Sequence, residues 1–161
     1  MREILFPLML AALCVWPIFA SEKRLWRILP SLVVVALIHP WLMGLFFWRA
    51  AQPASDSVPP EMTDFIMIGL YIAAAILAFG VLFHEFGVRD AASHRRSRSL
   101  VDCIYFSTIT WTTVGYGDFV PDSRVSRLIA AYEALLGYLT MASLVAAIVS
   151  MLTPNPNHAL R

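Results

Sequence analysis

The chain has 161 residues, of which 59% are hydrophobic and 14% are charged, and its mean hydropathy is +0.69. Such a composition is too apolar for a soluble domain and predicts a membrane protein, while the formal net charge of +1 argues against a nucleic-acid partner. Two cysteines, expected to be free thiols, and four scattered histidines form no disulfide framework, metal site or catalytic motif, so we expect neither an enzyme nor a cofactor.

Hydropathy predicts four membrane-spanning helices, since a helix needs about 20 apolar residues to cross ~30 Å of hydrocarbon. The predicted spans are residues 4–20, 28–48, 65–83 and 128–152. A polar segment rich in proline, residues 49–60, separates the first pair from the second. We therefore divide the chain into an N-terminal two-helix transmembrane module with its linker, residues 1–61, and a second module, residues 62–161.

The first span also resembles a signal peptide, because an apolar run precedes small residues at positions 20 and 21. However, Arg2 is offset by Glu3, and Ile18 is large for a position so close to a cleavage site. We therefore expect a retained first helix.

The string TTVGYGD, residues 112–118, stands between the last two spans. The apolar stretch before it, residues 101–111, would reach only about 16 Å as a helix, roughly half of the hydrocarbon core. Such a helix enters the membrane without crossing it. Asp102 lies at its start, where the positive end of the helix dipole would stabilise a carboxylate. In the string that follows, Gly115 and Gly117 tolerate backbone dihedrals that other residues avoid.

This string resembles the selectivity filter of potassium channels, in which four TVGYG loops offer backbone carbonyls to the ion. The resemblance covers residues 62–152 and is to the two-transmembrane pore-module superfamily, of small prokaryotic type. It implies an outer helix at about 62–86, a pore helix at about 101–112, a filter at 113–117 and an inner helix at about 126–152. The expected fold is an all-α membrane protein with four transmembrane helices, a re-entrant pore helix and a homotetrameric pore in the lipid bilayer.

The resemblance also implies roles for residues of the filter and its surroundings. The expected ion-binding residues are Thr113, Val114, Gly115, Tyr116 and Gly117, with K⁺ held by the carbonyls of the first four and the Thr113 hydroxyl. Tyr105 on the pore helix would support the filter by a hydrogen bond to Asp118, the alternative being an interfacial tyrosine and a solvated aspartate. Ile109 stands where some relatives place a carboxylate.

Two residues of the last span stand out from its apolar sequence. Gly137 interrupts a run that favours helix, and the resemblance makes it a gating hinge, with close helix packing as the alternative. Glu133 is expected to support the filter, because intramembrane carboxylates are costly; otherwise it would pair with Arg124 or Arg127. Residues at helical spacing after the glycine would line an apolar cavity: Tyr138, Met141, Val145 and Val149.

The expected function is passive, potassium-selective conduction. One alternative is a nonconducting or modulatory channel subunit. Another is a potassium-uptake transporter subunit, which would carry several pore repeats where this chain has one filter string. The basic residues of the first two spans gather at positions 23, 24 and 27 and do not recur at every third position, which argues against a voltage sensor.

The resemblance places the mouth of the filter outside a cell membrane and both chain ends in the cytoplasm. The distribution of basic residues disagrees, since nine of the twelve Lys and Arg residues would then lie outside. We follow the orientation of the filter, because the charge rule is statistical and has exceptions.

Overall fold

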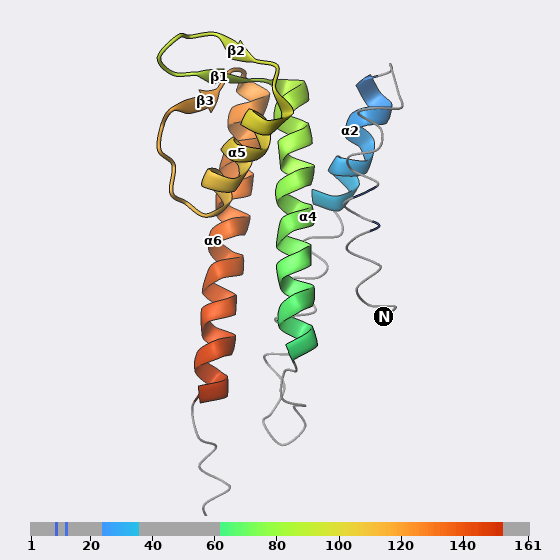
Figure 1. The fold of residues 1–161 in the computed structure, drawn as a ribbon, viewed down its shortest axis with the longest axis vertical. Coiled ribbons are helices and arrows are strands. Elements are labelled where there is room, and N and C mark those ends of the chain that lie inside the picture. Colours follow the sequence, from blue (N-terminus) through green and yellow to red (C-terminus); the bar gives the residue numbers. More distant parts are fainter. Residues whose placement is uncertain (1–8, 10–11, 13–23, 36–61, 153–161) are drawn as a thin grey trace, which may run out of the picture.

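The computed structural model describes residues 9, 12, 24–35 and 62–152 (Figure 1). Apart from residues 9 and 12, the first predicted span lies outside the described residues, as do most of the second span and the linker. The described part is mostly helical, with the elements in the order α2 (Arg24–Val33), α4 (Met62–Phe86), β1 (Val88–Asp90), β2 (Arg96–Ser97), α5 (Leu100–Trp111), β3 (Phe119–Pro121) and α6 (Arg124–Leu152).

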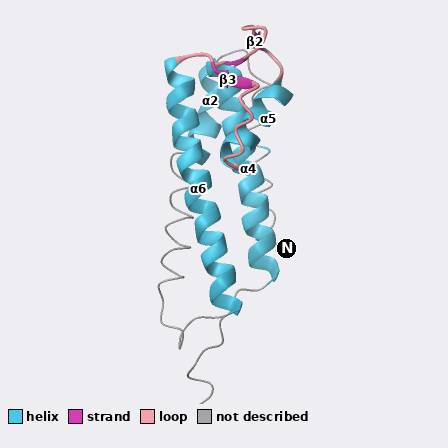
Figure 2. Cartoon of the chain, turned by 90° about the vertical axis from the view of Figure 1, so that its left-hand side faces the viewer, coloured by secondary structure: helices cyan, strands magenta, loops and turns pink. Residues whose placement is uncertain are grey.

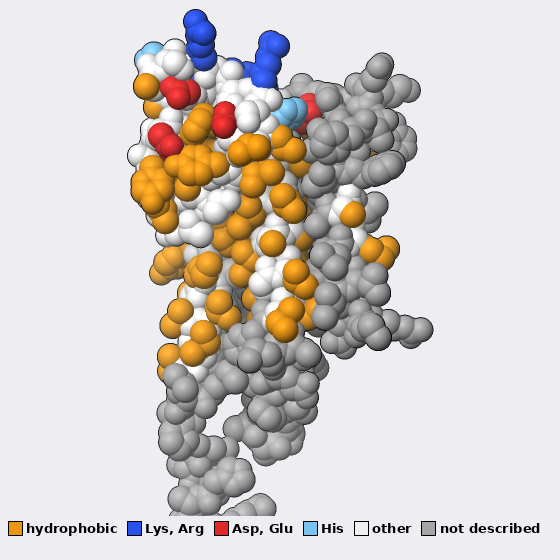
Figure 3. All heavy atoms as spheres, in the orientation of Figure 1, with side chains coloured by type: hydrophobic (Ala, Val, Ile, Leu, Met, Phe, Trp, Pro, Cys, Tyr) orange, Lys and Arg blue, Asp and Glu red, His pale blue; other side chains and the backbone are white. Residues whose placement is uncertain are grey.

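Two long helices, α4 and α6, form the frame of the molecule and run side by side (Figures 1 and 2). Among the described helices, these two are long and apolar enough to cross a membrane. They correspond to the third and fourth predicted spans. Figure 3 shows hydrophobic side chains along both helices and charged ones gathered at the end where the strands lie, as a membrane-spanning pair requires.

The short helix α5 packs against α4 and α6 and contributes to one hydrophobic core with them. Phe106 of α5 packs edge-on against Phe83 of α4, with ring centroids 4.8 Å apart. Trp111, the last residue of α5, is fully buried, and its ring centroid lies 6.2 Å from that of Phe79. Because large buried rings dominate core energetics, these two contacts fix the middle and the end of α5 against α4.

Helix α2 lies against α4 (Figure 1), and the Val35 carbonyl just after α2 accepts a hydrogen bond of 3.4 Å from the Tyr132 hydroxyl of α6. It begins at Arg24, four residues before the predicted second span. Ile28 of α2, and Val34 and Val35 directly after it, join the same core as α4 and α5. In the described part of the chain, this segment therefore packs against the α4–α6 pair.

A small antiparallel sheet in the order β2-β1-β3 closes one end of the molecule (Figure 1). Val88 pairs with Ser97 on one side and with Pro121 on the other. The described part of the chain is mostly helical, as expected, and the three short strands of this sheet are an addition that the sequence analysis did not predict. Strands of two or three residues show no alternation that a sequence pattern could reveal.

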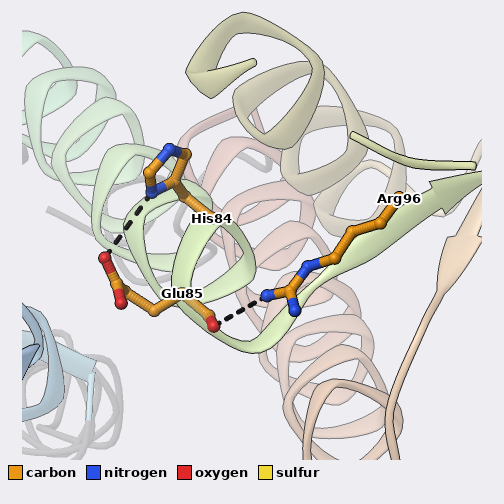
Figure 4. A network of polar contacts seen from close by, with 3 residues as sticks. All are labelled: His84, Glu85 and Arg96. Atoms are coloured by element: carbon orange, nitrogen blue, oxygen red, sulfur yellow. Dashed lines mark hydrogen bonds and ion pairs between the residues drawn. The ribbon is translucent and has the colours of Figure 1, made fainter. Parts of the chain in front are cut away.

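Side chains tie this sheet to the end of α4 (Figure 4). The Arg96 guanidinium donates a hydrogen bond of 2.9 Å to the Glu85 carbonyl. This carbonyl lies at the C-terminal end of α4, where the negative end of the helix dipole stabilises a cation. His84 Nδ1 lies 3.6 Å from Glu85 Oε1. In the turn after β1, the Ser93 backbone N–H donates to the Asp90 carboxylate at 2.6 Å, and this bond holds the pKa of Asp90 below its ordinary value.

Candidate functional site

The start of α5 is capped by side chains of the preceding loop. The Ser99 hydroxyl accepts a hydrogen bond from the backbone N–H of Asp102, as an N-cap residue does. The Asp102 carboxylate in turn accepts a bond of 2.6 Å from the Ser97 hydroxyl. Asp102 thus lies in the first turn, where its negative charge suits the helix dipole.

The motif segment, which we define as Thr112–Asp118, turns back as soon as α5 ends. Its N–H groups bind the last carbonyls of the helix: Thr112 to Thr108 at 3.0 Å, Thr113 to Thr110 at 3.1 Å and Gly115 to Ile109 at 3.1 Å. Figures 1 and 2 show α5 descending from the sheet and the following chain returning to the sheet. The geometry is that of a re-entrant helix followed by an extended return.

Alternate residues of the motif segment have a left-handed backbone. The φ values are 59° at Thr113, 52° at Gly115 and 80° at Gly117. Glycine adopts such values without penalty, whereas a β-branched threonine there is strained, and strain of this kind clusters at functional sites. In a regular strand, successive carbonyls point to opposite sides. The alternating positive φ values of the motif segment depart from that geometry and allow successive carbonyls to face one side.

The carbonyl groups of residues 113–116 are available to a ligand. Among the hydrogen bonds of the described residues, none ends on these four oxygens. The whole segment is exposed, and the side chains of Val114 and Tyr116 are 52% and 73% exposed. Since backbone carbonyls are obligatory hydrogen-bonding groups, those of this exposed segment need water or a ligand as a partner.

The far end of the motif segment is fixed by Asp118. Its carboxylate accepts a hydrogen bond of 2.8 Å from the Tyr105 hydroxyl, which joins the two side chains that the sequence analysis paired. Its backbone carbonyl accepts a bond of 2.8 Å from the N–H of Ala91 in the turn beyond β1. The Tyr105 ring also packs edge-on against Phe119 at 5.9 Å. Asp118 therefore connects the motif segment to both α5 and the sheet.

Glu133 is fully buried on α6 and contacts α5 rather than a basic residue. Its Oε1 lies 2.5 Å from the Ser107 hydroxyl, and it makes no ion pair with Arg124 or Arg127. The sequence analysis did not single out Ser107. A signal was present in the sequence: Ser107 is a small polar residue in one apolar helix, and Glu133 is a carboxylate in the next apolar helix, so the two could pair.

Gly137 lies where α6 crosses the last turn of α5. A Cβ atom added at this position would overlap the backbone carbonyl of Trp111. The absence of a side chain is therefore required by close packing, which was the alternative to a hinge. The expected cavity-lining residues follow on α6 and are all exposed in the single chain: Tyr138, Met141, Val145 and Val149.

Comparison with known proteins agrees with these features. The family model described as "Ion channel" matches residues 62–154, which is more than half of the chain. The chain belongs to this ion-channel family. Membership makes it a membrane protein of ion transport and points away from an enzyme.

Relatives of this ion-channel chain carry potassium-channel names. It is 36% identical over 93 residues to Two-pore potassium channel 1 of Arabidopsis thaliana, covering 57% of this chain and 24% of the relative. It is 31% identical over 87 residues to Two pore potassium channel a of Oryza sativa subsp. japonica, covering 54% and 23%. It is 34% identical over 123 residues to the voltage-gated potassium channel regulatory subunit KCNG2 of Rattus norvegicus, covering 74% and 23%.

These matches place the chain in the potassium-channel superfamily. The chain spans about a quarter of the length of each relative. No solved structure gives a significant match.

Proposed function

We propose that this chain conducts K⁺ passively and selectively as one of four identical subunits around a central pore. The observation that carries the proposal is the exposed segment 113–116, whose carbonyls accept no hydrogen bond within the described residues and along which left-handed residues alternate. A potassium ion gives up its hydration shell in a narrow pore, and a row of carbonyls replaces that water with protein oxygens. One row reaches an ion from one side only, so a closed ring of copies is needed to surround it.

The remaining residues support this row in the proposal. The Thr113 hydroxyl adds one ligand, and Gly117 completes the filter. Tyr105, Asp118 and Glu133 hold the filter from behind. Gly137 remains the proposed hinge, and a bend there would separate α6 from the carbonyl of Trp111 and so loosen the base of the pore helix. The lower pore would be lined by an apolar face that can close by dewetting: Tyr138, Met141, Val145 and Val149.

The exposed apolar side chains of the single chain support assembly. Val114 and Tyr116 on the motif segment, and the apolar face of α6, have no covering element within the described residues. Exposed apolar surface of this extent is normally buried against protein or lipid. In a ring of four copies, the motif segments would meet at the axis and their side chains would pack between neighbouring chains.

Ion flux through the purified protein tests the proposal. The chain is reconstituted into liposomes, and the flux of K⁺ is compared with that of Na⁺ under equal gradients. We expect K⁺ to pass at least tenfold faster, which corresponds to a difference of about 1.4 kcal/mol between the two barriers. Equal rates for the two ions would contradict a selective channel.

A second candidate is a regulatory subunit, because two of the similar proteins are named voltage-gated potassium channel regulatory subunits. Such a chain would give no flux in liposomes when it is alone but would change the flux of a conducting partner that is added to it. The same experiment therefore separates the two candidates.

A further inference from the structure

One buried hydroxyl, that of Ser107, joins α5 to both long helices. Ser107 has no exposed surface. Its Oγ lies 2.9 Å from the carbonyl oxygen of Ile76 on α4 and 2.5 Å from Oε1 of Glu133 on α6. Both separations are hydrogen-bond distances between oxygen atoms.

The number of hydrogen atoms limits how these two bonds can form. A serine hydroxyl carries one hydrogen, and the Ile76 carbonyl can only accept. If Ser107 donates to Glu133, its oxygen faces the Ile76 oxygen at 2.9 Å with no hydrogen between them. If Ser107 donates to Ile76, the contact with Glu133 needs a hydrogen from the carboxyl group. If each contact has a hydrogen atom of its own, only a protonated Glu133 satisfies both.

The surroundings of Glu133 lead to the same protonation state. The side chain is fully buried, and its Oε2 has no hydrogen-bond partner within the described part of the chain. No basic side chain of the described residues lies within ion-pair distance. An ionised carboxylate would therefore lie inside a membrane-spanning helix with a single hydrogen bond and no counter-charge, which is a costly arrangement.

We propose that Glu133 is held as a neutral carboxylic acid that donates its proton to Ser107, while Ser107 donates its hydroxyl hydrogen to the Ile76 carbonyl. These two bonds link α6 to α5 and α5 to α4, so Glu133 and Ser107 are positioning residues for the pore helix. Ile109 follows Ser107 by two residues, and its carbonyl accepts the N–H of Gly115. By fixing this part of the pore helix, Ser107 also fixes the Ile109 carbonyl that binds Gly115 of the filter. This consequence rests on the proposed function.

Infrared spectroscopy of the lipid-reconstituted protein tests the protonation state directly. The difference spectrum between the native chain and Glu133→Gln should contain the carbonyl stretch of a protonated carboxylic acid. If the difference contains the two stretches of an ionised carboxylate instead, the proposal is wrong. This measurement needs no ion flux, so it stands or fails independently of the proposed conduction.

Flux measurements test the positioning role. Glu133→Gln keeps a donor of similar shape and should retain the native ratio of K⁺ to Na⁺ flux, whereas Glu133→Ala and Ser107→Ala should lower it. The double variant Glu133→Ala with Ser107→Ala should be no worse than the more severe single one, because both remove the same link. Ser143→Ala is the matched control, since that buried hydroxyl bonds only the Leu139 carbonyl of its own helix. Equal losses in Glu133→Gln and Glu133→Ala would overturn the positioning role.

Discussion

At the scale of single residues, the motif segment depends on backbone conformation more than on side-chain volume. A Cβ atom added at Gly115 or Gly117 would meet nothing within 4 Å in the single chain. The requirement for glycine therefore comes from φ values of 52° and 80° rather than from a local clash. A left-handed conformation costs an ordinary L-residue about 1–2 kcal/mol.

We predict that substitutions at Gly115 lower potassium selectivity in the order set by this cost. Gly115→Val should be worse than Gly115→Ala, since a β-branched residue tolerates positive φ least, and Gly115→Asn should be mildest. The measurement is the ratio of K⁺ to Na⁺ flux in liposomes. Native selectivity in Gly115→Val would show that the left-handed conformation is not required for conduction.

At the scale of elements, the contact between α6 and the end of α5 determines what Gly137 can be replaced by. Alanine is the better helix former by about 1 kcal/mol, so an exposed glycine in a helix should gain stability on this change. At Gly137 the added methyl group would meet the Trp111 carbonyl, which is backbone and cannot rotate away. Packing therefore outweighs helix propensity at this position.

We predict that Gly137→Ala lowers the midpoint of thermal unfolding in lipid or detergent. Gly69→Ala on α4 is the matched control, because a Cβ atom there meets nothing within 4 Å, and it should leave the midpoint unchanged or raise it. If both variants behave alike, the close contact with Trp111 does not contribute to stability.

The sequence revealed the helices far better than it revealed the contacts between them. The apolar stretches 65–83, 101–111 and 128–152 lie within four residues of the bounds of α4, α5 and α6, because apolar length can be read directly from a sequence. The pairing of β1 with β3 and the meeting of Ser107 with Glu133 join residues 26 or more positions apart and depend on how the helices are rotated. The contact of Tyr105 with Asp118 was expected only through the family resemblance.

At the scale of the whole molecule, the number of chains in the assembly is the first quantity to measure. The uncovered face of the single chain leads us to predict that the purified protein has the mass of four chains in native mass spectrometry. Mixing chains with and without an affinity tag before assembly should give the five species of a random tetramer. A predominant monomer that still conducts K⁺ would rule out the proposed ring.

Orientation is a second property of the whole molecule, and cysteine labelling can determine it. Ala92 lies in the exposed turn after β1, whereas the Ser97 hydroxyl is bonded to Asp102 and should be left in place. In a chain with Cys14 and Cys103 replaced by alanine, a membrane-impermeant maleimide should label Ala92→Cys on intact cells. Ser55→Cys should be labelled only after the cells are opened, and the reverse pattern would invert the proposed topology.

The elements from α4 to α6 come from one unbroken stretch, residues 62–152, and this continuity makes the unit portable. The contacts of α5 with α4 and α6, and the pairing of β1 with β3, are all made within this stretch, although Ile28, Val34 and Val35 from outside it also join the core. A segment that carries so many of its own contacts can be joined to a different N-terminal region without losing them.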